Sequence, residues 1–266
     1  MTPILQDRLP ELIWMAPASA RLPGIQPVAG DDWLRRDEAF APQMALRDRL
    51  IAERPGAVHA LLPQARAAAA ELYDMILTRL AADPGYAPVP GGLRRPDGVV
   101  VPLDAAAPLR TLGRLVQPDL CLLQPGPAGG EALLTGAILC FPASWRLDQK
   151  IGRPMTAIHG PVPEYDPDLA ARVQRMLDAI RPGRPLWRGN ALIYDDPELH
   201  QPRAEGVPRP RPVRGDYVRS EYQVLMRLPR TGAVAFLIHT RVVRLAALPA
   251  EAAAALCARD GFALAP

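Results

Sequence analysis

Two apolar runs near the C-terminal end of the chain, residues 217–228 and 233–244, flank Pro229-Arg230-Thr231-Gly232. This spacing predicts an antiparallel hairpin, because a short turn with Pro and Gly joins two strand-length segments. Side chains of a strand point alternately to its two faces. One face of the first run would carry Val218, Ser220, Tyr222, Val224, Met226 and Leu228, and the other Arg219, Glu221, Gln223, Leu225 and Arg227.

Periodicity and turn residues predict the remaining elements. Residues 1–30 are rich in proline and predict an extended lead-in. Helices that lead into an antiparallel sheet indicate an α+β fold. We expect a helical N-terminal extension, residues 1–110, packed on a core formed by residues 111–266 as one structural unit. Helices are predicted over residues 38–54, 57–82, 144–151, 166–180 and 249–259, and strands over residues 99–101, 120–123, 133–141 and 187–194.

Composition narrows the class of protein. The chain has 266 residues and a formal net charge of +3, and Lys150 is its sole lysine among many arginines. Acidic and basic residues are interleaved, which disfavours nucleic-acid binding, since nucleic-acid-binding proteins concentrate basic residues on one face. No apolar run reaches about 18 residues, and the N-terminus lacks a basic segment followed by an apolar one. We therefore predict neither a membrane span nor a signal peptide, and we expect a cytoplasmic location.

The segment Cys140–Tyr165 contains the residues most suited to bind a cofactor. It places His159 in a predicted loop that Pro161 and Pro163 would stiffen. An imidazole for the iron and cations for the propionates are what a b-type haem requires. A solvated histidine beside a solvated basic turn explains the same residues, so both interpretations stay open here. The basic residues that precede the histidine are Arg146, Lys150 and Arg153.

Three cysteines, Cys121, Cys140 and Cys257, lack Cys-x-x-Cys spacing. This disfavours a disulfide framework and a zinc or iron–sulfur site built from this chain alone. Cys121 and Cys140 fall in apolar strands and are predicted to be core residues. A thiolate haem ligand stays open as an alternative to the histidine.

The polar face of the predicted strand 217–228 also allows two interpretations. A solvated face would form cross-strand ion pairs, each contributing about 0.2–1 kcal/mol. A buried face would form a polar wall beside a bound molecule, where Glu221 could hold a cationic amine. The second strand adds His239, which lies opposite Tyr222 in one register and opposite Glu221 after a one-residue slip. If this part of the hairpin lines the oxygen site of a haem, His239 becomes a rival or second axial ligand.

Four stretches, in order over residues 24–246, carry a recognisable pattern. The longest reads Cys-Phe-Pro-x-x-Trp-x-Leu-x-x-Lys-x-Gly-x-Pro-x-x-x-Ile-His-x-Pro-Val-Pro-x-Tyr and ends at Tyr165. Together the stretches resemble the haem-dependent oxidative N-demethylase-like family. The other three are Asp31 to Glu38 with Gln43 to Arg47, Trp187 to Asn190 with Asp195 to Pro197, and Arg219 to Ala233.

The resemblance implies a PAS-like antiparallel sheet with flanking helices, and haem b bound through His159. It also implies that dioxygen oxidises a small secondary amine to a carbinolamine, which releases formaldehyde. Glu221 and Arg219 would orient the amine and polarise the oxygen. Flavin and iron–sulfur centres would reside on a separate reductase subunit, and the chain could form an oligomer. The expected catalytic residues are Glu221, Arg219 and His239, and the expected cofactor-binding residues are Arg146, Lys150, Arg153 and Arg227.

The chain departs from the family pattern at two places. Ile-Arg-Thr-Tyr in the family reads Ile238-His239-Thr240-Arg241 here, and the tryptophan expected after Asn190 is Ala191. Exchanging a phenol for a guanidinium removes a neutral hydroxyl donor and adds a fixed charge. The departure at His239 and Arg241 favours the alternative of a haem-binding sensor or gas-binding protein without turnover. A binding module that has lost the haem is a third possibility.

Overall fold

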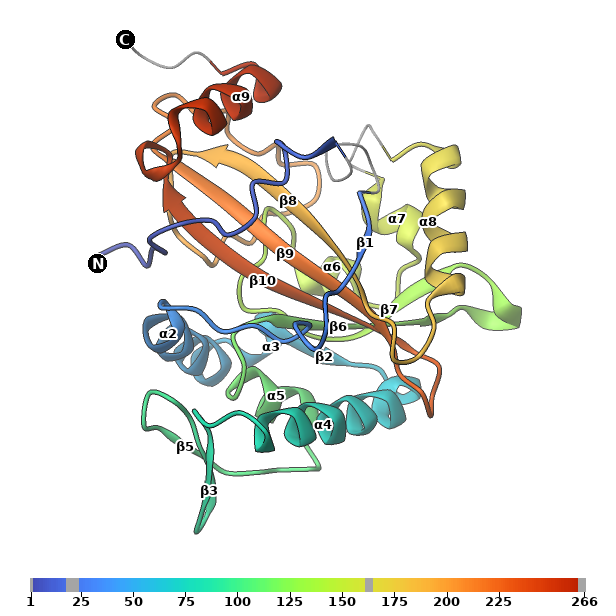
Figure 1. Ribbon diagram of the computed structural model, residues 1–266. Helices are drawn as coiled ribbons and strands as arrows, with labels where there is room; N and C mark the ends of the chain where they lie inside the picture. The colour runs from blue at the N-terminus through green and yellow to red at the C-terminus, as the bar shows by residue number, and fades with distance from the viewer. Residues whose placement is uncertain (1, 18–23, 161–164, 263–266) are drawn as a thin grey trace.

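The computed structural model describes residues 2–17, 24–160 and 165–262, and it shows an α+β fold built on one large antiparallel sheet. The strand order is β1-β8-β9-β10-β6-β7-β2, so the β9–β10 hairpin occupies the middle of the sheet (Figure 1). A second, three-stranded sheet has the order β3-β4-β5. The strands are β1 (Gln26–Pro27), β2 (His59–Leu61), β3 (Ala87–Val89), β4 (Gly92–Arg94), β5 (Val100–Val101), β6 (Asp119–Pro125), β7 (Ala132–Ile138), β8 (Leu186–Tyr194), β9 (Tyr217–Arg227) and β10 (Val234–Arg244).

Helices cover both faces of the large sheet. One face packs against α2, α4 and α5, and the other packs against α6, α7 and α8, while α9 packs near β8 (Figure 1). The α-helices are α2 (Phe40–Glu53), α3 (Pro55–Val58), α4 (Arg66–Ala81), α5 (Pro108–Gly113), α6 (Leu147–Lys150), α7 (Met155–His159), α8 (Pro167–Ala179) and α9 (Ala250–Asp260), and the 3-10 turns are η1 (Pro63–Ala65), η2 (Pro127–Gly129) and η3 (Leu245–Ala247).

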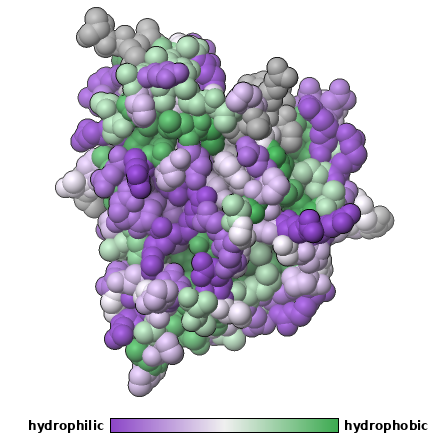
Figure 2. Space-filling view, viewed as in Figure 1, coloured by the Kyte–Doolittle hydropathy of each residue, from purple (hydrophilic) through white to green (hydrophobic). Residues whose placement is uncertain are grey.

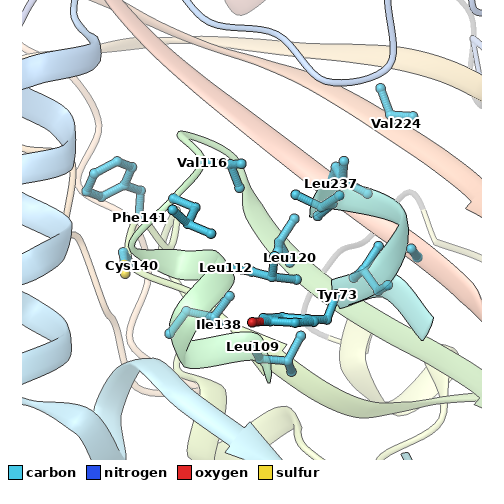
Figure 3. Close-up of a cluster of buried hydrophobic side chains, with 14 of the residues drawn as sticks. Tyr73, Leu109, Leu112, Val116, Leu120, Ile138, Cys140, Phe141, Val224 and Leu237 are labelled. Carbon is cyan, nitrogen blue, oxygen red and sulfur yellow. The ribbon is translucent and has the colours of Figure 1, made fainter. Parts of the chain in front are cut away.

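The larger core lies between the sheet and the layer formed by α2, α4 and α5. Figure 3 shows Leu109 and Leu112 of α5 and Tyr73 of α4 gathered in one cluster with the strand residues Leu120 and Leu237. Each of these aliphatic side chains is almost fully buried. Burying a leucine side chain contributes about 1.5–3 kcal/mol, so this layer accounts for much of the driving force for folding.

A buried ion pair joins this helical layer to the sheet. Arg47 of α2 donates to the Asp119 carboxylate at 2.6 Å, and both side chains have 0% exposure. Asp119 also accepts hydrogen bonds from the backbone N–H groups of Cys140 (2.7 Å) and Phe141 (2.8 Å). A buried charge requires a partner of this kind, because an unpaired one would lose its solvation without compensation.

The predicted hairpin and the predicted helix at residues 166–180 are confirmed. The turn before β10 uses Gly232 at φ 70°, a left-handed conformation that glycine adopts without strain. Helix α8 begins where Asp166 accepts a hydrogen bond from the Leu169 N–H at 2.7 Å, with proline at its first position. Both features follow from local sequence signals.

Two predicted elements are wrong in detail. The helix expected over residues 57–82 begins at Arg66, and His59 lies instead in strand β2, which pairs with β7. His159, expected in a loop, ends helix α7, while Pro161 and Pro163 lie outside the described residues. Strands β1 and β2 both come from residues 1–110 and join the large sheet, so this part of the chain supplies more than helices. In the described part of the chain, no helix is both long enough and apolar enough to span a bilayer.

Candidate functional site

Helix α7 is held against the large sheet by its own first turn and by the segment that precedes it. The N–H and hydroxyl groups of Thr156 donate to the Glu131 carboxylate at 2.6 and 2.7 Å. The backbone of Leu134 in β7 exchanges hydrogen bonds with Gly152 and Arg153. These contacts fix the helix that carries His159 over the sheet face on which Leu225 and Ile238 lie.

The imidazole of His159 has one ring nitrogen occupied and one available. Its Nδ1 bonds to the Met155 carbonyl at 2.9 Å, and Nε2 makes no hydrogen bond to any described residue. The ring stacks on Tyr165 with 4.4 Å between centroids. Burial lowers the pKa of His159 below its usual value, and the charges of Arg188 and Lys150 lower it further. A neutral imidazole whose Nδ1 faces a carbonyl presents an Nε2 lone pair, which is the arrangement found in metal-ligating histidines.

The predicted cofactor-binding cations fall in different environments. The buried Lys150 donates to the Ile158 carbonyl at 2.9 Å, beside His159, and it lies 3.4 Å from Glu205. Arg153 is exposed and pairs with the same Glu205 at 3.0 Å. The structure therefore brings Lys150 next to the histidine. Arg153 is linked to Lys150 through the Glu205 carboxylate that both residues contact.

Arg146 lines a cavity of about 500 Å³ that His159 and its hydrogen-bond partner Met155 do not border. It pairs with Asp148 and is exposed. His200 borders the same cavity and bonds through Nδ1 to the Cys140 carbonyl at 2.8 Å. The structure does not bring Arg146 together with His159.

The polar face of β9 is buried, which excludes the solvated interpretation. Arg219 is 4% exposed, and Glu221 and Gln223 are each 7% exposed. The Gln223 amide donates to Glu221 at 2.7 Å, and the Arg219 guanidinium lies 3.8 Å from the same carboxylate. Because Ile238 of the layer under α7 pairs with Gln223, this face is the one that α7 covers.

Two arginines of this face donate hydrogen bonds to backbone carbonyls. Arg219 donates to the carbonyls of Phe141 at 2.7 Å and Leu199 at 3.0 Å, so it ties two loops to the strand. Arg227 donates to the carbonyls of Ile180 at 2.7 Å and Leu177 at 2.5 Å, where helix α8 ends. Donors placed there satisfy carbonyls that the helix leaves unpaired. The geometry gives Arg227 a role in holding α8 and does not bring it to His159.

Arg188 is a residue of this site that the sequence analysis missed. It lies on β8 directly opposite Gln223, and its buried Nε has no hydrogen-bond partner among the described residues. Burial lowers the pKa of Arg188 from its usual value, and the charge of Glu221 opposes that shift. The motif Trp187 to Asn190, which the sequence analysis noted, could have identified Arg188. Pairing that strand with β9 in register would have placed Arg188 and Asn190 opposite the polar row.

His239 lies on the opposite face of the sheet from Glu221. The register pairs it with Tyr222, and its Nε2 lies 2.8 Å from the Asp37 carboxylate. Arg241 contacts the same carboxylate at 3.4 Å and Glu11 at 3.0 Å. His239 therefore belongs to a buried network under the N-terminal segment, and the structure separates it from His159. Figure 2 shows hydrophilic residues gathered across the middle of the molecular face on which that segment lies.

Acidification is expected to lower the stability of the fold through this network. Burial lowers the pKa of His239, and its hydrogen bond to Asp37 only partly opposes the shift. Burial would raise the pKa of Asp37, but the bond from His239, the amide of Gln117 and the charge of Arg241 outweigh it and hold the pKa well below its usual range. In both cases the unfolded chain takes up protons that the native state resists, so stability present at neutral pH is lost as the pH falls.

Denaturant titrations at about pH 7 and about pH 5 measure the histidine part of this loss. The His239→Gln variant should lose less stability over that interval than the unaltered protein. A remainder is expected from His59 and His159, because burial lowers both of their pKa values. An unchanged pH dependence in the variant would contradict the assignment.

The cysteines behave as core residues. Burial raises the pKa of Cys140 to about 12, and it also raises the pKa of Cys121. Both thiols are free and buried. A thiol that stays protonated in an apolar layer is a poor metal ligand, so the geometry favours the imidazole of His159.

In a comparison with protein-family models, residues 24–260 match the model described as haem-dependent oxidative N-demethylase, alpha subunit-like. The chain belongs to this family. A search of curated proteins gives no significant match. For a haem-dependent N-demethylase alpha subunit-like protein, the donor set around α7 fits the cofactor: a neutral imidazole whose Nε2 bonds to no described residue, a buried lysine beside it, and an exposed arginine that shares Glu205 with that lysine. These groups suit an iron ligand and propionate partners.

Proposed function

We propose that this protein is a haem b-dependent oxidative N-demethylase-like monooxygenase subunit that acts on a small secondary amine. The observation that supports it most directly is that His159, whose Nε2 bonds to no described residue, and the buried Glu221 lie on the same side of the sheet, on the face that α7 covers. A separate reductase carrying flavin and iron–sulfur centres would supply electrons, and both proteins would work in the cytoplasm. The sheet would be of the PAS-like type.

His159 would hold the haem iron, and Lys150 and Arg153 would contact the propionates. When bound, the haem supplies the redox chemistry of dioxygen. The reaction balances when one N-methyl group, one dioxygen, two electrons and two protons give the demethylated amine, formaldehyde and water. The polypeptide's part is to bind the amine, orient its methyl group and exclude water.

Glu221 is the residue that we assign to the amine. Its carboxylate is held by the Gln223 amide at 2.7 Å and is nearly removed from water. A carboxylate in such a place attracts an ammonium group strongly, because the local dielectric is low. Glu221 can also accept the proton that the ammonium must lose before its nitrogen lone pair becomes available.

The test is amine-dependent formaldehyde release by the haem-loaded protein under an artificial reductant. The Glu221→Gln variant keeps the shape and removes the charge, so we expect its kcat/KM to fall about 100-fold, a typical effect for one charged catalytic group. Asp168→Asn, which removes an exposed carboxylate on α8, should have no effect. Equal rates in the unaltered protein and the Glu221→Gln variant would contradict the assignment.

The same assay separates the enzyme from a haem-binding sensor. A sensor would bind carbon monoxide reversibly, and its reductant consumption would not respond to amines. The departures at His239 and Arg241, which favoured a sensor in the sequence, lie on the far face of the sheet from Glu221. They therefore do not alter the group assigned to the amine.

A further inference from the structure

The polar face that β8 and β9 share contains buried hydrogen-bonding atoms that no described residue satisfies. Two are donors, Nε of Arg188 and Nε of Arg219, and one is an acceptor, Oε1 of Gln223. Arg188 pairs directly with Gln223 across the two strands, and Arg219, Glu221 and Gln223 alternate along β9. Buried polar groups are nearly always hydrogen-bonded, so a cluster of this kind on one face calls for a polar ligand.

This face carries more positive than negative charge, which does not suit a ligand that is only a cationic amine. Among the described residues of β8 and β9 that lie around Glu221 on this face, two guanidinium groups, Arg188 and Arg219, accompany this one carboxylate. The nearest approach of Arg219 to that carboxylate is 3.8 Å. Arg219 is compensated by the backbone carbonyls of Phe141 and Leu199, whereas the Nε of Arg188 has no acceptor in the described chain. A cationic amine would satisfy Glu221 and leave Arg188 beside another positive charge, which is unfavourable in a desolvated site.

We propose that the substrate of this site is a zwitterion, a small N-methyl amino acid whose carboxylate binds Arg188 and whose methylammonium group binds Glu221 and the Gln223 carbonyl oxygen. This inference rests on the proposed function and narrows its substrate from a secondary amine to one that also carries an acid group. Arginine is suited to the task because its fork of N–H donors matches a carboxylate. Both ends of such a ligand then meet an opposite charge.

Calorimetric titration of the purified holoprotein tests the recognition directly. The probes are N-methylglycine and dimethylammonium, which share a methylammonium group and differ in the carboxylate. N-methylglycine should bind at least about tenfold more tightly, the effect expected of one charge-assisted hydrogen bond to a carboxylate. Equal binding, or tighter binding of dimethylammonium, would overturn the proposal.

The Arg188→Leu variant should lose the tenfold preference while binding dimethylammonium as before and retaining its haem. Arg184→Leu removes an exposed arginine just before β8 and should change nothing. If Arg188→Leu does not fold, the Arg188→Lys variant is tested instead. Lysine keeps the positive charge but lacks the planar fork of donors, so this variant should keep only part of the preference for N-methylglycine. Loss of haem from a folded Arg188 variant would show that this residue binds a propionate, and would overturn the proposal.

The two hypotheses fail separately. Absence of the haem absorption band, or absence of turnover with either amine, would count against the proposed function. The calorimetric preference for N-methylglycine would still report on Arg188 and Glu221, because it measures binding and not oxidation. A preference that is present in the unaltered protein and unchanged in Arg188→Leu would contradict the inference alone.

Discussion

Replacing Asp119 with alanine is expected to lower the free energy of unfolding by about 3–5 kcal/mol, the usual cost of removing one partner of a buried ion pair. The Arg47 guanidinium would remain fully buried without its ion-pair partner, since the carboxylate to which it donates at 2.6 Å is Asp119. The backbone N–H groups of Cys140 and Phe141 would lose their acceptors as well. Three consequences in one substitution make this the most destabilising change that the structure indicates.

Urea titration followed by circular dichroism measures the loss. Glu53→Ala is a matched control, because it removes an exposed carboxylate from the same helix as Arg47 and should change stability by less than about 0.5 kcal/mol. The loss of unfolding free energy in Asp119→Asn should lie between the losses in these two variants, since the amide oxygen can still accept hydrogen bonds from the backbone. A loss for Asp119→Ala no larger than that for Glu53→Ala would show that the pair does not hold α2 against the sheet.

Replacing His159 with glycine is expected to abolish stable haem binding, and added imidazole should restore it. Removing the side chain takes away the iron ligand and leaves space where a free imidazole can enter. Haem retained per polypeptide after gel filtration, with and without imidazole, is the measurement. A purely structural role for His159 would not respond to imidazole, because the backbone contact of Nδ1 to Met155 belongs to the same helical turn.

His200→Gly is the control for this experiment. His200 also bonds through Nδ1 to a carbonyl, that of Cys140, but it borders the cavity of about 500 Å³ with Trp145. Its removal should leave the haem content unchanged. Loss of haem in His200→Gly together with retention in His159→Gly would show that the iron ligand lies at the cavity that His200 borders and not on α7.

Local signals in the sequence were enough to predict the central hairpin and α8. Alternation over residues 217–228 placed Arg219, Glu221 and Gln223 on one face, and the Asp166-Pro167 pair marked where a helix begins. Alternation could not tell whether the polar face was wet or buried. The burial of this face depends on α6, α7 and α8, which precede β9 in the sequence and cover the face in the folded protein.

The features that the sequence did not predict depend on pairing between strands distant in the sequence. His59 follows one short helix and precedes an alanine-rich one, and only its pairing with β7 makes it part of a strand. Arg188 became a site residue through its register with Gln223 on a strand distant in sequence. The one-residue ambiguity at His239 was resolved by the hairpin register opposite Tyr222. Propensity alone carries no information about such partners.

The most direct test of the central claim is the ultraviolet–visible spectrum of the purified protein, expressed with ample haem, in the ferric and dithionite-reduced states. The account predicts a Soret band that shifts on reduction and is lost in the His159→Ala variant. A colourless protein, or a Soret band that is the same in the unaltered protein and in His159→Ala, would contradict it.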